Sequence, residues 1–273
     1  MSSLFTTIAA STLDISRTIL RYRKIIWATT KVELAKRYSG SALGLSWLFL
    51  NSALLLAMYL FIYMVIFKVR FPGYSDFDYV LYVFGGLIPY FGFSEAIASG
   101  SPCIKQNIHL VKNVLLPIEL IPVRVVIVSM VTQLVSMGIL IFLVMLNRNL
   151  SFHLLWLPAI FILQFLFLVG LVWILSALAV PLPDVGYFVN LFVFFLMFIS
   201  PIGFKLDMVP APLKLIVSLN PIYYMIEMYR CSIVDGQWPA PNLLLVYVLM
   251  CTGCFALGAA FFQRFKTVLV DYE

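Results

Sequence analysis

Two cysteines are the side chains whose type and spacing come closest to a reactive or metal-binding site. Cys251 and Cys254 form a Cys-x-x-Cys pair, a spacing used by zinc sites and thiol redox motifs. The pair lies in an apolar run without a second pair of ligands, so we interpret it as two small residues one turn apart on a membrane helix. His109 and His153 each stand alone in the sequence. We therefore expect no metal site.

Patterns typical of an enzyme are absent from the sequence. There is no phosphate-binding loop of the form Gly-x-x-x-x-Gly-Lys-Ser/Thr, no Gly-x-Ser-x-Gly motif and no paired set of His, Asp or Glu. The long uncharged runs contain no Asp, Glu, Lys or Arg, whereas ion-driven transporters generally place such residues inside the membrane. We expect a chain that is not an enzyme, binds no cofactor of its own and draws any energy for transport from another protein.

The composition places these residues in a membrane. The chain has 273 residues, of which 63% are hydrophobic and 11% charged, and its mean hydropathy is +1.04. Soluble domains carry about 25% charged residues, so the composition argues strongly against a soluble enzyme. A membrane-spanning helix needs roughly 20 apolar residues, which leaves room for several spans and none for a separate soluble catalytic domain.

Uncharged runs predict an all-α integral membrane protein with six transmembrane helices in one domain, 1–273. The predicted helices are 42–67, 79–100, 120–147, 154–180, 185–204 and 236–263. The second includes Glu95, which we expect to face protein or a polar pathway rather than lipid. With the N-terminus in the cytoplasm, the inside segments hold twelve of the 18 Lys and Arg residues, so we expect both termini to be cytoplasmic.

Residues 11–38, before the first span, have the pattern of an amphipathic helix. Apolar residues recur at helical spacing, at Ile15, Ile19, Tyr22 and Ile26. Basic residues lie on nearly the opposite side, at Arg17, Arg21, Lys24 and Lys31. Such a helix lies in the membrane interface with its apolar face toward lipid. The alternative is a basic segment that only anchors the cytoplasmic side of the first span.

The predicted first cytoplasmic loop, 101–118, contains a short helix between Pro102 and Pro117. This helix has a narrow apolar stripe made by Ile104, Ile108 and Val111. A short amphipathic helix on the cytoplasmic side is suited to docking onto a soluble partner. The alternative is an ordinary interfacial loop.

Residues 205–235, after the fifth run, contain prolines that break helices. Non-helical backbone at membrane depth needs protein or a water-filled cavity around it, so we expect short re-entrant helices that dip back from the outer face. Glu227 and Arg230 are three residues apart and close enough on a helix to pair. We interpret the region as a gate at the outer mouth of a passage, formed by Pro201, Asn220, Pro221, Glu227 and Arg230.

Aromatic residues make up 16% of the chain. Two sets recur at helical spacing in the first and fifth spans: Tyr59, Tyr63 and Phe67, and Phe192, Phe195 and Phe198. Aromatic faces suit the apolar C–H edges of sugar rings, so both sets are candidates to line a passage. The alternative is that they face lipid or pack between helices.

Five short motifs follow one another along the chain. They are Arg37-Tyr38-x-x-Ser41-x-Leu43-Gly44-x-x-Trp47; Gly85-Gly86-Leu87-Ile88-Pro89; Asn107-x-x-Leu110-Val111-Lys112-Asn113 with Pro117-x-Glu119-x-Ile121-Pro122; Ser200-Pro201-Ile202; and Asn220-Pro221-Ile222 through Tyr229-Arg230. Together they resemble the membrane-spanning subunits of polysaccharide-exporting ABC transporters. The resemblance covers about residues 31–266 and is nearest to the permeases of O-antigen (lipopolysaccharide) exporters, beside those for capsule and teichoic acid.

The resemblance implies a homodimer that works with two copies of a separate ATP-binding subunit, which holds ATP and Mg. It implies a polysaccharide substrate linked to undecaprenyl pyrophosphate, export across the bacterial inner membrane, and no nucleic-acid partner. The expected contacts with the ATP-binding subunit are Arg17, Arg21, Lys24, Lys105, Asn107, His109 and Lys112. The expected contacts with the lipid pyrophosphate are Arg23, Lys36 and Arg37, since Arg presents paired donors to phosphate; the alternative is that these cations only set the topology.

Other functions stay open at the level of sequence. One alternative is an ABC permease for a capsular or teichoic polymer, or for a drug or small lipid. Another is an intramembrane enzyme of lipid metabolism, which would act without ATP or a partner.

Overall fold

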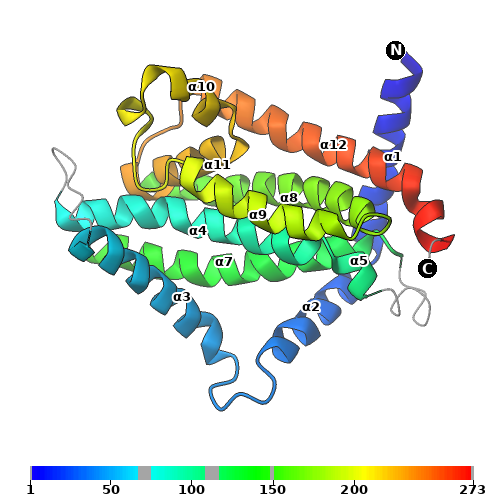
Figure 1. Ribbon diagram of the computed structural model, residues 1–273, viewed down its shortest axis with the longest axis horizontal. Helices are drawn as coiled ribbons and strands as arrows, with labels where there is room; N and C mark the ends of the chain where they lie inside the picture. The colour runs from blue at the N-terminus through cyan, green and yellow to red at the C-terminus, as the bar shows by residue number, and fades with distance from the viewer. Residues whose placement is uncertain (1, 67–74, 108–116, 148–150, 272–273) are drawn as a thin grey trace.

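The computed structural model describes residues 2–66, 75–107, 117–147 and 151–271, and within those ranges its regular structure is helical throughout (Figure 1). The α-helices are α1 (Ser2–Arg21), α2 (Arg23–Arg37), α3 (Ser46–Leu60), α4 (Asp76–Gly100), α5 (Cys103–Gln106), α7 (Leu120–Asn147), α8 (Leu157–Ala179), α9 (Asp184–Ile199), α10 (Ala211–Leu219), α11 (Pro221–Arg230) and α12 (Pro241–Asp271). Short π- and 3₁₀-helical turns extend or join them: η1 (Phe61–Ile66), η2 (Phe152–Trp156), η3 (Leu206–Met208) and η4 (Cys231–Asp235).

Length and composition support five of the six predicted spans among the described residues. The five stretches are Ser46–Ile66, Asp76–Gly100, Leu120–Leu146, Phe152–Ala179 and Pro241–Lys266. The sixth candidate, α9, has 16 residues and is about 24 Å long, whereas the hydrocarbon core is about 30 Å thick. It ends at Ile199 and not at residue 204, because Ser200 is extended and Pro201 cannot continue a helix.

The N-terminal segment differs from the single amphipathic helix expected over 11–38. The structure has two helices separated at Tyr22, and the first begins at Ser2. Ile15 and Ile26 are buried because α1 packs against α12 and α2 packs against α7. The apolar stripe predicted to face lipid therefore packs on the helical bundle. A second apolar set on the same helices is exposed: Leu13, Leu20, Ile25, Trp27 and Val32.

The spanning helices differ greatly in how deeply they are buried. In the most apolar stretch of 18 residues in α4, 83% of the residues are buried inside the protein. In the corresponding stretch of α3 and η1, 12% of the residues are buried. Figure 1 shows α4, α7 and α8 running side by side, with α12 along one face and α3 diverging from the bundle. The start of α4 is fixed by a capping box in which Ser75 Oγ accepts a hydrogen bond from Asp78 N at 3.1 Å. The bundle is therefore organised around α4, and α3 is its outlying member.

Two glycines allow α8 and α12 to approach each other closely. A Cβ atom at Gly258 would lie 2.2 Å from Gly170 O, and one at Gly170 would lie 2.4 Å from Cys254 O. Small residues let helix backbones touch where lipid provides no hydrophobic force between helices. Cys254 lies at this crossing and its Sγ donates to Phe167 O at 3.6 Å. The Cys-x-x-Cys pair thus belongs to a helix-packing surface.

Gly258→Ala should destabilise the purified protein by about 1–3 kcal/mol, because the new methyl group meets the backbone of α8 and overpacks the crossing. The measurement is thermal unfolding in detergent. Gly253→Ala is the matched control, because Gly253 lies on the same helix and has open space around it. Equal melting temperatures for the two variants would show that α8 and α12 are not in backbone contact.

Candidate functional site

Arg230, at the end of α11, is fully buried and joins α11 to α4 and to the segment that follows α9. Its guanidinium donates to Ile202 O at 2.6 Å, to Tyr82 Oη at 2.9 Å and to Tyr82 O at 3.2 Å. It also pairs with Glu227 at 3.3 Å and lies 3.6 Å from the centre of the Tyr82 ring. A Cβ atom at Gly86 would lie 2.7 Å from Arg230 Nη2. The glycine in α4 therefore makes room for the guanidinium.

Asn220 joins the start of α11 to the end of α9. Its side-chain oxygen accepts from Ile222 N at 3.0 Å and caps α11, which begins with Pro221 at its first position. Its amide donates to Ser200 Oγ at 2.9 Å. The predicted gate residues are thus brought together by two connections, Asn220 with Ser200 and Arg230 with Ile202, on either side of Pro201.

A buried polar cluster holds α11 against the spanning helices. Gln133 of α7 and Gln164 of α8 exchange amide hydrogen bonds of 2.9 and 2.8 Å. Tyr229 Oη of α11 donates to Gln164 Oε1 and accepts from Gln133 Nε2 at 3.2 Å. Each polar group has a partner, as burial in a membrane bundle requires. Sequence reasoning missed this cluster, although Gln133 and Gln164 are conspicuous polar residues inside otherwise apolar runs.

The aromatic residues predicted to line a passage fall into two groups. Tyr59 packs inside the chain, where its Oη donates to Met197 Sδ at 3.2 Å and connects α3 to α9. Phe192, Phe195 and Phe198 lie on the exposed face of α9, with exposed fractions of 48%, 56% and 63%. The side chain of Tyr63 and the whole of Phe67 lie outside the described residues.

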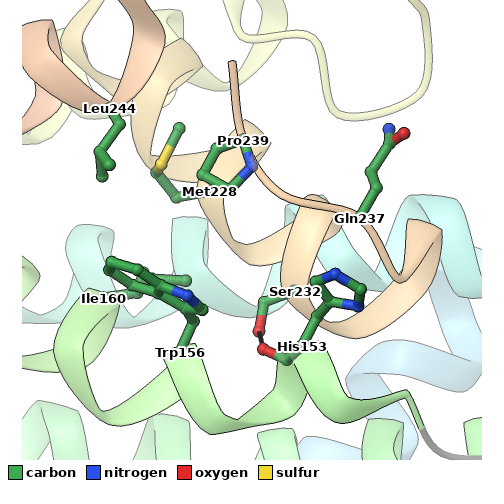
Figure 2. A pocket seen from close by; sticks show the side chains of 8 residues that line it. All are labelled: His153, Trp156, Ile160, Met228, Ser232, Gln237, Pro239 and Leu244. Atoms are coloured by element: carbon green, nitrogen blue, oxygen red, sulfur yellow. Dashed lines mark hydrogen bonds between the residues drawn. The ribbon is translucent and has the colours of Figure 1, made fainter. Parts of the chain in front are cut away.

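A small aromatic cluster lies just before the start of α8 and of α12. Figure 2 shows His153, Trp156 and Ser232 around a cavity of about 10 Å³, which is room for about one water molecule. Ser232 Oγ donates to His153 O at 2.8 Å, and Trp238 contacts both His153 and Trp156 edge to face. His153 therefore has a packing role.

The turn between α2 and α3 projects from the side of the bundle, where the two helices form a V in Figure 1. The turn requires left-handed backbone at Gly40 and Gly44, with φ of 83° and 49°. Trp47 Nε1 donates to Ser41 Oγ at 2.7 Å across it. This geometry places Arg37, the last residue of α2, beside α4.

Arg37 pairs with Glu95 of α4 through Nη1 and Oε1, and their side chains are 30% and 24% exposed. Burial raises the pKa of the neighbouring Tyr38 hydroxyl, with Arg37 lowering it and Glu95 raising it by their charges. Lys36 is exposed next to Arg37, whereas Arg23 is at the other end of α2, roughly 20 Å away along the helix axis. The three cations predicted to bind one pyrophosphate therefore form two separate groups.

Arg124, at the start of α7, connects the first loop with α2. Its side chain is 7% exposed, and Nη2 donates to Asn107 Oδ1 at 2.8 Å and lies 3.8 Å from Glu33 Oε2. Asn107 in turn donates to Cys103 O at 2.9 Å at the end of α5. From the sequence, Arg124 is used only to predict which side of the membrane is cytoplasmic, although it is the one charged residue in the α7 sequence.

The residues predicted to contact an ATP-binding subunit are mostly at the surface where they are described. Arg17, Arg21, Lys24 and Lys105 are exposed, and Asn107 is half-buried against Arg124. His109 and Lys112 lie outside the described residues. Because these cations are exposed, α1, α2 and α5 present positive charge that suits an acidic protein surface.

Arg230→Leu should lower the free energy of unfolding by about 3 kcal/mol or more, because it removes the buried guanidinium that donates to Ile202 O and to both oxygens of Tyr82. Arg230→Lys should recover little, since an ammonium cannot span the same acceptors. Glu227→Gln, at a half-exposed partner, should have a much smaller effect. Thermal unfolding in detergent measures all three, and equal melting of Arg230→Leu and Glu227→Gln would contradict the assigned contacts.

Arg124→Leu should expose the loop before α7 to protease and destabilise the protein by about 1.5–3 kcal/mol, the range for a hydrogen bond to a charged group. Limited proteolysis with mass mapping follows the loop, and thermal unfolding follows the whole chain. Arg264→Leu is the control, because Arg264 is exposed on α12. Identical cleavage of the two variants would show that Arg124 does not hold the loop.

Comparison with known proteins places this architecture in a family. Residues 24–234 match the family model described as ABC-2 type transporter. The "O-antigen export system permease protein RfbA" of Myxococcus xanthus is 25% identical over 232 residues, 84% of this chain and 87% of the relative. A Klebsiella pneumoniae protein of the same name is 27% identical over 241 residues, 87% of this chain and 90% of the relative. Because the family model covers well over half of the sequence, this chain belongs to the ABC-2 type transporter family, as a membrane-spanning component that associates with ATP-binding ABC subunits.

Proposed function

We propose that this chain is the permease of a bacterial O-antigen exporter, which moves undecaprenyl-pyrophosphate-linked polysaccharide across the inner membrane. The observation that carries the proposal is the similarity, over 84–87% of the chain, to relatives named as O-antigen export permeases. The absence of charged residues from α3, and from α9 beyond Asp184, fits a passage for a polar polymer, because strong fixed charges inside would retain or repel it.

Two copies of the chain form the passage in this proposal. α3 and α9 are apolar helices with many exposed large side chains, and Tyr59 connects them. Large exposed apolar faces on membrane helices are covered by lipid or by another protein copy. We assign the exposed α9 aromatics, Phe192, Phe195 and Phe198, to the polymer path, where sugar rings slide over aromatic faces.

Energy comes from two copies of a separate subunit that binds ATP and Mg. The exposed cations Arg17, Arg21, Lys24 and Lys105 supply its docking surface, together with His109 and Lys112. Arg124 connects α2 with the loop that carries Asn107, so a partner that binds one arrangement of these elements more tightly shifts the permease toward it. The short re-entrant helices α10 and α11 form the outer gate, which Arg230 and Asn220 hold to α4 and α9.

Both termini lie on the cytoplasmic side in this proposal. Gln263 Nε2 of α12 donates to Ser11 O of α1 at 3.2 Å, so the two terminal helices meet at the same end of the bundle. The lipid pyrophosphate binds at this side, to Arg37 and Lys36. Arg23 is too far along α2 to share that phosphate group, and its place is with the docking surface.

Deletion of the gene in its native strain tests the proposal. Lipid-linked polymer should accumulate inside the cell and surface O-antigen should be lost, with both restored by a plasmid copy of the chain. The measurements are gel analysis of surface lipopolysaccharide and extraction of intracellular lipid-linked glycan. Normal surface polymer in the deletion strain would rule out this function and favour a permease for a drug or small lipid.

A further inference from the structure

A cavity of about 350 Å³ lies between α3, α4 and α7. Its lining includes Ser99, next to the end of α4, and Thr132 of α7. Thr132 is about 18 Å along the helix axis from Leu120, the first residue of α7, at 1.5 Å per residue. Its polar wall residues come from all three helices: Asn51, Ser52, Ser94, Ser99, Thr132 and Ser136. The cavity thus presents hydroxyl and amide groups on a wall whose remaining surface is mostly apolar.

The polar groups of this wall use only part of their hydrogen-bonding capacity within the protein. Ser136 Oγ donates to Ser52 Oγ at 2.8 Å, and Thr132 Oγ1 donates to Val128 O at 3.3 Å. A hydroxyl that donates to its own helix still has acceptor lone pairs, and polar groups between membrane helices are costly unless a polar partner reaches them. The cavity is therefore suited to a ligand with several hydroxyl groups.

Glu95 belongs both to the cavity wall and to the ion pair with Arg37. A guanidinium presents paired donors that fit a carboxylate and a phosphate equally well. The Glu95 carboxylate therefore occupies the position on Arg37 that an incoming phosphate would take. A ligand whose phosphate meets Arg37 would place the atoms attached to that phosphate inside the cavity.

We propose that this cavity binds the phosphorylated sugar head group of a membrane lipid, and that Glu95 is an internal anion that the lipid phosphate displaces from Arg37. This inference rests on the proposed function and assigns the site for its substrate's head group. The sugar hydroxyls bond to the Ser, Thr and Asn groups of the wall, and Phe91 offers an aromatic face. The volume is at the lower end of the range for ligand pockets, as suits a head group rather than a polymer.

The lipid chain has a place beside the same cavity. Leu54 and Met58 of α3 are 55% and 52% exposed, so α3 has an exposed apolar surface next to the cavity. A lipid can thus keep its hydrocarbon in the bilayer while its head group enters between α3 and α4. A soluble sugar phosphate lacks this second contact, and we commit to the lipid as the ligand.

The test is binding of defined lipids to the purified chain in detergent, followed by native mass spectrometry. The probes are a polyprenyl pyrophosphate with one N-acetylated hexose, the same lipid without sugar, and the soluble hexose phosphate. Glu95→Gln should tighten binding of both lipids by about three- to tenfold, because it removes the anion that competes for Arg37, while Arg37→Gln should weaken both by at least as much. Thr132→Val and Ser94→Ala should weaken only the lipid that carries the sugar.

Thr252→Val is the matched control, because Thr252 is exposed on α12 and bonds to its own helix at Val248 O at 2.7 Å. Unchanged or weaker lipid binding by Glu95→Gln, equal effects of Thr132→Val and Ser94→Ala on both lipids, or tight binding of the soluble hexose phosphate would overturn this site. Each variant's melting temperature checks its fold. These measurements need neither ATP nor export, so a chain that exports O-antigen but fails them would retain its proposed function and lose this site.

Discussion

Hydrocarbon supplies no hydrogen-bond partners, and this constraint determines where the polar side chains of the chain can be. Arg230 can be fully buried because Tyr82 and Ile202 accept hydrogen bonds from its guanidinium, and Gln133 and Gln164 are buried because they bond to each other and to Tyr229. Both groups converge on α11, the short helix that follows the proline breaks. Its position against α4, α7 and α8 is thus set by paired polar groups, while apolar packing alone would leave it free to slide.

Two parts of the molecule use the same principle for different purposes. Arg230 bonds mostly to backbone carbonyls and a tyrosine, which fixes one geometry. Arg37 pairs with Glu95 through side chains that are both partly exposed, and such pairs exchange partners at little cost. In the proposed function, the fixed contacts hold the gate and the exchangeable pair meets the substrate.

The sequence was sufficient for the parts of the fold that depend on local physics. Apolar run lengths predicted six spans, of which five are long apolar helices in the structure. The prolines after the fifth run predicted a break into short helices, although α9 ends at Ile199 and not at residue 204. It also predicted the pair Glu227–Arg230, because both residues are on one helical turn. The acceptors of Arg230 on α4 could not be predicted, since they depend on how distant segments meet. Likewise, helical periodicity places Ile15 on an apolar stripe but does not predict whether lipid or protein covers that stripe.

The candidate passage was the hardest part to predict, and the exposed surfaces explain why. Helical spacing grouped Phe192, Phe195 and Phe198 correctly on one side of α9, yet that side contacts little else within the chain. Most of α3 is equally uncovered, apart from the contact of Tyr59 with α9 and that of Ser52 with α7. In the proposed homodimer these faces meet their copies, so the residues that line the passage are completed only by a second chain. A single sequence specifies the helices that enclose such a path, whereas the path itself is a property of the assembly.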